Sequence, residues 1–454
     1  MTIQASRIQE LNHLPPSSGR FVLYWMQQSQ RAEYNHALEY AIEQANIQGR
    51  PILVLFALTD DYPEANLRHY TFMLEGLKET KQQLVSRGIQ MVVRYGDPVQ
   101  VALNVGLNAS MIVCDRGYLS HQRGWRQEIA KKAACGVVQV ESDVIVPIQE
   151  VSDKAEYAAY TIRPKINRQL DMYLKELVPK IVSHSSLSIP VKGLELDNIQ
   201  TVSDQLDIDR SVPAVPKFFT GGTSQAKDRF KYFLKNCFQR YVAHRNQPKT
   251  LDVSFMSPYL HFGQVSSLYL ALKIKSCQDH LEEAKASYLE ELIVRRELAM
   301  NFVYFNPAYR SLECLPNWAK KTLDEHKKDA REFLYSKYAL ENGQTHDTYW
   351  NAAMREMKVS GFMHNYMRMY WGKKILEWSE TPEKAYETLT AINNTYFLDG
   401  RDPNSYAGIG WIFGLHDRAW FKRPVFGKVR YMAASGLERK CDIKGYVSRI
   451  NQMI

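Results

Sequence analysis

Short apolar runs alternate with amphipathic segments through the first third of the chain. The amphipathic segments, for example 33–45 and 66–88, place their apolar residues at the spacing of one helix face. The apolar runs have the length of strands and lie at residues 21–28, 51–58, 90–96, 110–117 and 137–147. This alternation predicts a doubly wound, Rossmann-like parallel sheet with helices on both faces. No GxGxxG pattern follows the first run, so the standard dinucleotide fingerprint is absent.

The rest of the chain changes character twice. Residues 181–217 show little periodicity and contain Ser, Asp and Pro residues, a composition typical of a long connector. From residue 218 onward nearly every segment has helical spacing. We therefore expect four parts: a loose or helical tail at 1–19, an α/β domain at 20–180, an inter-domain linker at 181–217 and an all-α domain at 218–454.

Tryptophans gather in the last part of the helical region. Five of the eight lie between Trp350 and Trp420, and Trp371 and Trp378 share one face of a predicted helix. Gly372 costs about 1 kcal/mol against Ala in a helix interior, so we expect a bulky group to approach it closely. A polar, Gly-rich loop follows at residues 398–408. Aromatic stripes commonly build cores, but these two features favour an aromatic-walled pocket for a planar cofactor.

Composition narrows the class of protein. The chain has 454 residues, of which 45% are hydrophobic and 24% charged, as in globular proteins of several domains. It contains no apolar stretch of membrane-spanning length and no apolar segment of a secretory signal near residue 1. Six cysteines without a CxxC motif argue against zinc, iron–sulfur and disulfide frameworks and favour a reducing compartment. The net charge of +9 is compatible with a nucleic-acid partner, although charge alone is weak evidence.

Several long motifs resemble one family. They are RMYWGKKILEW at 368–378, AINN at 391–394, YFLDGRDPNSYAG at 396–408 and HDRAW at 416–420. These runs are similar to the C-terminal half of class II cyclobutane pyrimidine dimer photolyases, and a weaker similarity extends over the N-terminal third. The resemblance implies an α/β N-terminal domain, an all-α C-terminal domain that binds FAD, and no metal in the site.

The resemblance also implies which residues hold the flavin. Arg368 and Asp399 match a pair beside the flavin ring, where the arginine stabilises an anionic reduced flavin and the aspartate orients it. Asn393 matches the asparagine that faces flavin N5, although an asparagine here is also a common C-cap. Asp399 before Gly400 is likewise a turn signal. The other matches to flavin-contacting positions are Tyr241, Ser254, Phe255, Met256 and Ser257.

The segment around Ser257 has a second interpretation. Ser257 followed by Pro258 predicts a helix start, with Ser257 as the N-cap. The free N–H groups of a helix start can bind the flavin phosphates, but ordinary capping explains the same residues equally well.

Three tryptophans match the family's electron-transfer residues. They are Trp350, Trp371 and Trp378. We expect Trp371 to lie nearest the flavin, because Trp350 belongs to the preceding segment and reaches the others only through the fold.

The substrate contacts implied by the resemblance are spread more widely. Glu291 matches a glutamate that binds the base edges of the dimer, a role that a protonated carboxyl with a pKa raised by burial would serve. Its alternative is a plain helix-surface ion pair among Glu290, Glu291 and Arg295. Met369 and Trp411 match apolar clamps around the flipped dimer. Arg245 matches a side chain that fills the vacated duplex, and the expected phosphate contacts are Arg295, Arg296 and Arg418.

The implied activity is light-driven repair of cyclobutane pyrimidine dimers in double-stranded DNA. The dimer is flipped out, excited FADH⁻ donates an electron to it, the ring opens and the electron returns. Class II members with a known antenna use an 8-hydroxy-5-deazaflavin type of chromophore, but no residue fixes its presence here. We expect a monomer without membrane contact, in the cytoplasm and associated with the nucleoid when bound to DNA.

Three alternatives remain open. A cryptochrome-type light receptor often departs from asparagine at the position of Asn393, so Asn393 favours repair. A (6–4) photolyase requires catalytic histidine chemistry, for which His364 and His416 are candidates. A flavin-free DNA-binding helical protein is the third alternative.

Overall fold

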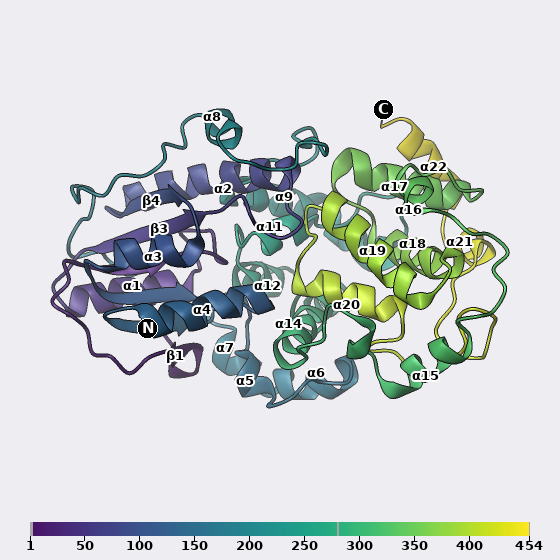
Figure 1. The fold of residues 1–454 in the computed structure, drawn as a ribbon, viewed down its shortest axis with the longest axis horizontal. Coiled ribbons are helices and arrows are strands. Elements are labelled where there is room, and N and C mark those ends of the chain that lie inside the picture. The colour runs from purple at the N-terminus through teal and green to yellow at the C-terminus, as the bar shows by residue number, and fades with distance from the viewer. Residues whose placement is uncertain (1–2, 279–280, 454) are drawn as a thin grey trace.

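The computed structural model describes residues 3–278 and 281–453. An α/β part and a helical part lie side by side, and α5, α6 and α7 bridge them along one edge (Figure 1). The bounds of these three helices are Ile148–Val151, Ala159–Asn167 and Leu170–Tyr173. The predicted fold class is confirmed.

The α/β part is built on a six-stranded sheet with the order β1-β6-β5-β2-β3-β4. The strands are β1 (Ile8–Glu10), β2 (Phe21–Trp25), β3 (Ile52–Leu58), β4 (Gln90–Tyr95), β5 (Ala109–Asp115) and β6 (Gly136–Val140). The strands β2 to β6 are parallel, whereas β1 pairs with β6 in the antiparallel direction. The expectation of a loose or helical tail is therefore wrong for residues 8–10. The buried guanidinium of Arg7 anchors this segment to the carbonyl oxygens of Glu141 and Val144.

Helices cover both faces of the sheet, as the alternation predicts. One face packs against α1 (His36–Ile47) and α2 (Leu67–Ser86), and the other against α3 (Pro98–Gly106) and α4 (Ser120–Lys132). Along β2, Val22 and Tyr24 face the first layer, whereas Leu23 and Trp25 face the second. Because both faces are buried, the strands appear as continuous apolar runs in the sequence.

The segment 181–217, which we expect to be the inter-domain linker, crosses the surface of the α/β part and includes the short helix α8 (Ile199–Asp204), above α2 in Figure 1. It runs beside the edge strand β4, where the Leu194 N–H donates to the Val93 carbonyl over 2.7 Å and the Ser186 hydroxyl accepts the Gln90 N–H over 2.7 Å. The linker thereby covers backbone groups of an otherwise open sheet edge.

The helical part follows. Among its described residues, every secondary-structure element is a helix. Its α-helices are α9 (Thr223–Asn236), α10 (Tyr241–His244), α11 (Ser257–His261), α12 (Ser267–Lys275), α13 (Glu282–Leu289), α14 (Arg296–Phe305), α15 (Asn317–Glu325), α16 (Lys337–Glu341), α17 (Thr348–Ser360), α18 (Asn365–Trp378), α19 (Pro382–Tyr396), α20 (Pro403–Ile412), α21 (Ala434–Lys440) and α22 (Ile443–Asn451). A π-helix, η4 (Glu290–Arg295), joins α13 to α14. The short 3₁₀ helices are η1 (Ala5–Arg7), η2 (Phe238–Arg240) and η5 (Leu312–Cys314).

Buried polar side chains join the two parts. The Glu297 carboxylate on α14 accepts the Ile145 N–H, which follows β6, over 2.5 Å. Arg68 on α2 donates to the carbonyl oxygens of Met357 and Tyr396, over 3.1 and 2.6 Å. Burial raises the pKa of Glu297 to about 8. No described helix is long and apolar enough to cross a membrane.

Candidate active site

A large cavity lies within the helical part. Its volume is about 740 Å³, and it lies between residues of α10, α11, η4, α14, α18, α19 and α20. Single-ligand pockets commonly enclose about 300–1,000 Å³. This cavity therefore has the volume expected for one large ligand.

Most of the residues singled out in the sequence meet at this cavity, although they come from distant segments. They are Tyr241, Arg245, Ser254, Phe255, Met256, Ser257, Glu291, Arg295, Arg296, Arg368, Met369, Trp371, Asn393, Asp399 and Trp411. Trp350, Trp378 and Arg418 lie outside its wall.

Arg368 and Asp399 form an ion pair on the wall, with 3.0 Å between the guanidinium and the carboxylate. A second hydrogen bond joins the Arg368 Nε to the Met363 carbonyl over 3.0 Å, and its guanidinium carbon lies 3.9 Å from the centre of the Phe397 ring. These contacts fix the guanidinium at the cavity, where it can stabilise a negative charge. The expected turn chemistry is also present nearby, because the Asp402 side chain caps α20.

Asn393 is 6% exposed and belongs to the last turn of α19, and its carbonyl accepts the Phe397 N–H. Both expectations for this residue are compatible, since it helps to end the helix and also lines the cavity. Its side-chain Nδ2 donates to Asn394 Oδ1 over 2.9 Å. That bond directs the amide without adding a charge.

The three tryptophans form a continuous buried series. Trp371 lines the cavity and stacks on Trp350, with ring centres 6.5 Å apart and planes inclined by 15°. Trp350 contacts Trp378 at 5.6 Å. From Trp378 the aromatic contacts continue at 5.2 Å to His346, which is exposed. The series therefore runs from the cavity wall to the surface.

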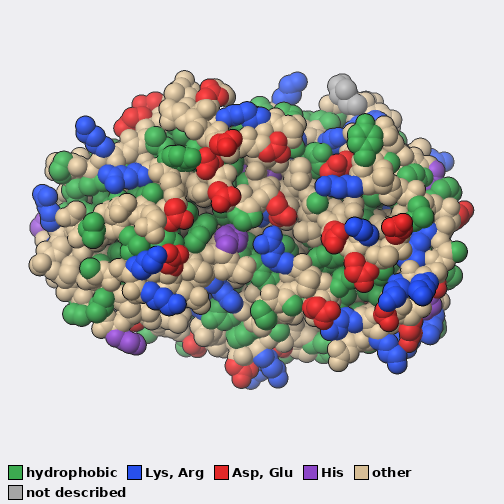
Figure 2. Space-filling view, viewed as in Figure 1, with side chains coloured by type: hydrophobic (Ala, Val, Ile, Leu, Met, Phe, Trp, Pro, Cys, Tyr) green, Lys and Arg blue, Asp and Glu red, His purple; other side chains and the backbone are tan. Residues whose placement is uncertain are grey.

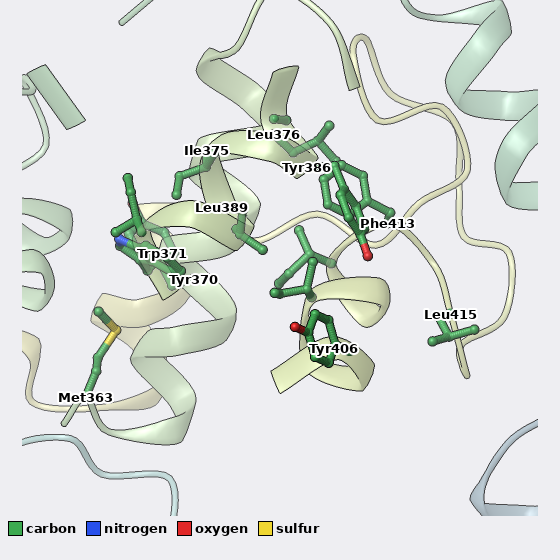
Figure 3. Packing of buried hydrophobic residues seen from close by; sticks show 14 of the residues in the cluster. Met363, Tyr370, Trp371, Ile375, Leu376, Tyr386, Leu389, Tyr406, Phe413 and Leu415 are labelled. Carbon is green, nitrogen blue, oxygen red and sulfur yellow. The ribbon is translucent and has the colours of Figure 1, made fainter. Parts of the chain in front are cut away.

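The bulky neighbour of Gly372 is part of the protein. A Cβ at this position would lie 2.7 Å from Ile412 and 3.1 Å from Leu389. Figure 3 shows Leu389 and Trp371 in this packed cluster. The glycine therefore permits α18, α19 and α20 to approach one another, and it also lines the cavity beside Trp371.

The π-helix η4 presents Glu291 and Arg295 to the cavity. Glu291 accepts a hydrogen bond from Arg245 over 2.5 Å, so it is not part of the expected helix-surface pair. Arg295 instead pairs with Glu290, five residues earlier, at 3.0 Å. The Glu291 side chain is 40% exposed, so the burial that the sequence analysis expects for it is absent.

The segment before α11 differs in detail from its prediction. Ser257 is the first residue of α11 and Met256 is the N-cap, so the assignment of Ser257 as N-cap is wrong. The helix has only five residues and contributes little dipole. Phe255 adopts a left-handed backbone (φ 57°), and the Ser254 hydroxyl pairs with Tyr288 at 3.0 Å. Strained, hydrogen-bonded backbone at a cavity is common at ligand sites.

Trp411 and Met369 are half-buried on the wall, as expected for apolar clamps. Beneath Trp411 lies the buried ammonium of Lys373, 4.6 Å from the indole centre and hydrogen-bonded to the Ile412 carbonyl over 2.6 Å. Burial lowers the pKa of Lys373 to about 7.

The expected phosphate contacts divide into two kinds. Arg295 and Arg418 are exposed, as such a contact requires. Arg296 is 6% exposed and donates to the Asp143 carbonyl of the α/β part. It joins the two parts of the molecule, so a role at a phosphate does not fit.

Sequence reasoning missed Arg430. It lines the cavity, pairs with Asp417 at 3.0 Å and lies 4.2 Å from the centre of the Trp420 ring. It follows a stretch without helical periodicity, so no sequence pattern marked it.

A second, smaller cavity of about 80 Å³ lies where the two parts meet. It is bounded by the carboxyl ends of β2 and β3, by α2 and by the residues that precede α20. Ligands of doubly wound sheets bind at this edge. His261 and Asp402, paired at 3.1 Å, line both cavities and form a shared wall.

The larger cavity fits FAD, the cofactor that the resemblance implies. Its wall offers the Arg368 guanidinium for negative charge and the Trp371 indole for ring contact. The Trp371 Nε1 is buried without a hydrogen-bond partner, as expected of a donor beside a ligand.

Known proteins are similar to this chain over its whole length. A family model described as DNA photolyase matches residues 22–182. The deoxyribodipyrimidine photo-lyase of Methanothermobacter thermautotrophicus is 48% identical, with 100% of this chain and 99% of the relative covered. The deoxyribodipyrimidine photo-lyase of Arabidopsis thaliana is 38% identical, with 95% and 89% covered.

Two solved structures share the fold. The class III photolyase from Agrobacterium tumefaciens matches with a TM-score of 0.75 at 17% identity, over 96% of this chain and 87% of that chain. The archaeal photolyase from Sulfolobus tokodaii with two FAD molecules matches with a TM-score of 0.67 at 16% identity, over 94% and 89%.

Proposed function

Because the chain belongs to the deoxyribodipyrimidine photo-lyase family, a family of enzymes, we propose that it repairs cyclobutane pyrimidine dimers in double-stranded DNA under light. Its motifs favour the class II type. The observation that carries the proposal is the single large cavity, where the implied flavin residues and the implied substrate residues line one continuous wall.

A reduced FAD, when bound, supplies the electron that light transfers to the dimer. The protein's share is electrostatic and positional. Arg368, held by Asp399 and Met363, favours negative charge in a site where the effective dielectric is low. Asn393 offers a neutral amide, which avoids the repulsion that a carboxylate would exert on that charge.

The series of tryptophans supplies a separate path. Trp371, Trp350 and Trp378 are in ring contact, and the last of them contacts an exposed histidine. Such a series supports inward transfer of electrons from the surface, which would return an oxidised cofactor to its working state. We assign this task, and not repair itself, to the three residues.

The other end of the cavity has the features of a lesion pocket. Glu291 and Arg245 offer polar contacts to base edges, and Trp411 and Met369 offer apolar faces. A dimer is poorly stacked in its duplex, so its extrusion costs less than the few kcal/mol of a normal base. The exposed Arg295 and Arg418 would bind phosphates without reading sequence.

The basic residues do not form one continuous patch on the face shown in Figure 2, where positive and negative side chains are interspersed. DNA affinity would then depend on a few arginines near the cavity rather than on the net charge of +9. One chain supplies all of the cavity wall, so we propose a monomer, acting in the cytoplasm and on the nucleoid.

The pKa values of the two histidines considered for (6–4) chemistry favour repair of cyclobutane dimers instead. Burial lowers the pKa of both His364 and His416 to about 4. Near pH 7 both rings are therefore neutral and poorly suited to donate a proton.

The second cavity supports a second chromophore. It lies at the carboxyl ends of the strands, where doubly wound sheets bind ligands, and aromatic rings line it. We assign to it the antenna of 8-hydroxy-5-deazaflavin type.

The test is a repair assay on the intact protein. Chemically reduced, flavin-loaded protein is mixed with a duplex that contains one thymine cyclobutane dimer, and thymine absorbance is followed in blue light and in darkness. Recovery of absorbance in light alone is the expected result. If the flavin-loaded protein binds this duplex and repairs none of it, the proposal fails, and a (6–4) substrate becomes the next to assay.

A further inference from the structure

A phenol lies against the outer end of the tryptophan series. The rings of Trp378 and Tyr335 are in contact, with centres 5.4 Å apart and planes inclined by 74°. The Tyr335 N–H donates to the Trp378 carbonyl over 3.2 Å. Nearby, Arg331 Nε donates to the Ser379 carbonyl over 2.9 Å. Residues 331–335 are therefore bound to the end of α18, and these backbone contacts hold the two rings together.

The Tyr335 hydroxyl has a base beside it. Its oxygen accepts the His346 backbone N–H over 3.0 Å and lies 2.7 Å from His346 Nδ1. A neutral imidazole with its proton on Nε2 accepts at Nδ1, and the phenol is then the donor. The imidazole is also stacked on Phe333, with ring centres 3.8 Å apart. An acceptor for the phenolic proton is thus in place before any electron moves.

The burial of these groups sets the direction in which charge moves. Trp378 is 2% exposed, so a positive charge on its indole is costly to hold there. The Lys374 ammonium, 5.7 Å from the indole centre, adds to this cost, although the ion pair of Lys374 with Glu377 offsets part of it. His346 is exposed, so water can solvate a charge on its ring. Positive charge is therefore more stable on His346 than on Trp378.

Among the described residues, Tyr335 is the tyrosine whose ring contacts the tryptophan series. Tyr370 lies on the same helix as Trp371 and Trp378, but its hydroxyl donates to Asp347 and its ring contacts neither indole. Tyr370 is also fully buried, whereas Tyr335 is half-buried. A reductant in solution can therefore approach Tyr335.

We propose that Tyr335 is a redox-active residue, the terminal electron donor of the series, and that His346 is its proton acceptor. Once the indole of Trp378 has lost an electron inward, the Tyr335 phenol gives one electron to that indole and its hydroxyl proton to His346 Nδ1. The O–H bond breaks and an N–H bond forms. The products are neutral Trp378, a neutral phenoxyl radical and an imidazolium.

The radical is then reduced from solution. A thiolate supplies one electron and becomes a thiyl radical, and the proton returns to the Tyr335 oxygen from His346. This inference rests on the photoreduction path proposed for the three tryptophans and adds the two residues at which that path ends.

The experiment records the radicals that a light flash forms in the full chain loaded with oxidised flavin. In the wild-type protein, the absorbance of an indole radical should give way to that of a phenoxyl radical. Ring-deuterated tyrosine should narrow the electron paramagnetic resonance signal of protein frozen under illumination. Deuterium oxide should slow the appearance of the phenoxyl radical, because this step moves a proton, and should leave formation of the indole radical unchanged.

Replacement of the phenol tests the donor. Tyr335→Phe keeps an aromatic ring against Trp378 and removes the hydroxyl. It should abolish the phenoxyl signal and shorten the lifetime of the separated charge by about tenfold or more. Tyr338→Phe is the matched control, because Tyr338 is 70% exposed and makes no ring contact with the series. The control should match the wild-type protein in both readouts.

Replacement of the imidazole tests the base. His346→Ala should slow formation of the phenoxyl radical by about a hundredfold, the lower range of the contribution of a positioned base. Because His346 is exposed, imidazole added to the buffer should restore part of the rate. A residue that only packs against Phe333 would show no such recovery. Flavin content and thermal unfolding check that each variant is folded.

The outcomes separate this inference from the proposals on which it rests. An indole radical that decays without a phenoxyl radical in the wild-type protein overturns the role of Tyr335 and leaves the tryptophan path standing. Absence of the indole radical removes that path, and the inference with it. A phenoxyl signal that survives in Tyr335→Phe assigns the radical to another tyrosine and overturns the inference.

Repair by chemically reduced wild-type protein tests the proposed function separately, because it needs no photoreduction. The labelling experiment on the wild-type protein needs no variant, so a misfolded Tyr335→Phe protein does not prevent a decision.

Discussion

At the scale of single residues, the indole of Trp371 has two neighbours of different kinds. On one side the indole lines the cavity. On the other side lies Trp350, whose Nε1 donates to the Trp371 carbonyl over 3.0 Å. A residue in this place can affect the redox state of a bound cofactor without touching a substrate.

Replacement of Trp371 by Phe should therefore slow photoreduction of the oxidised flavin by about tenfold or more, equivalent to about 1.4 kcal/mol of barrier. Repair by chemically pre-reduced protein should change little. Both are followed by absorbance, with Trp318→Phe, outside both cavity walls, as the matched control. Loss of pre-reduced repair together with photoreduction would contradict the assigned role.

Glu291 and Glu290 are adjacent on η4 but point to different partners. Glu291 lines the cavity and pairs with Arg245, whereas Glu290 lies outside the cavity wall and pairs with Arg163 and Arg295. The two residues make a natural pair for comparison.

Glu291→Gln should lower the repair yield per absorbed photon by about tenfold or more, because a hydrogen bond to a charged group is worth about 1.5–3 kcal/mol. Flavin content should stay constant. Glu290→Gln should leave the yield unchanged. Equal yields in the two variants would return Glu291 to a structural role.

At the scale of elements, the packing of α18, α19 and α20 depends on Gly372. The side chains of Ile412 and Leu389 fill the space that a Cβ would need. The glycine lowers the helix propensity of α18 but lets α19 and α20 pack close to it.

Gly372→Ala should lower the free energy of unfolding by about 1 kcal/mol, since overpacking costs about 1–3 kcal/mol and the helix regains about 1 kcal/mol. Gly124→Ala is the control, because that glycine lies within α4 with nothing within 4 Å of an added Cβ. The control should gain about 0.4–1 kcal/mol. Urea unfolding measures both, and a stabilised Gly372→Ala protein would contradict the packing argument.

The elements also show what could be predicted from the sequence. The strands β2 to β6 were predictable because burial on both faces leaves unbroken apolar runs. Three-residue β1 was not, because Ile8, Gln9 and Glu10 have no apolar pattern. The π-helix η4 was equally hidden, since one extra residue per turn leaves the apolar spacing nearly helical. Most site residues could be predicted because they belong to long motifs. The neighbours of Gly372 and the position of Arg430 could not, because they depend on how distant segments pack.

At the scale of the whole molecule, the buried carboxyl of Glu297 links the two parts, and burial disfavours its charged form. The pKa of Glu297 is raised to about 8 by burial, from an ordinary value of 4.5. The folded state therefore holds a proton that the unfolded state releases, and the associated stability is lost as pH rises from about 4.5 to about 8.

Glu297→Gln should remove this pH dependence. The wild-type protein should lose stability relative to the variant across that window, by an amount on the order of a few kcal/mol at the upper end. Thermal unfolding of both proteins from pH 5 to pH 8, a range set by the pKa of about 8, makes the comparison. A constant difference between them would show that Glu297 does not titrate there.

The wall shared by the two cavities has a thermodynamic consequence. His261 and Asp402 contribute to both. A ligand that shifts this pair from one side alters the affinity of the other side, and reciprocity requires the two factors to be equal. Retention of the flavin would then depend on whether the second cavity is occupied. In cells that do not make the second chromophore, the enzyme would bind its flavin with a different affinity.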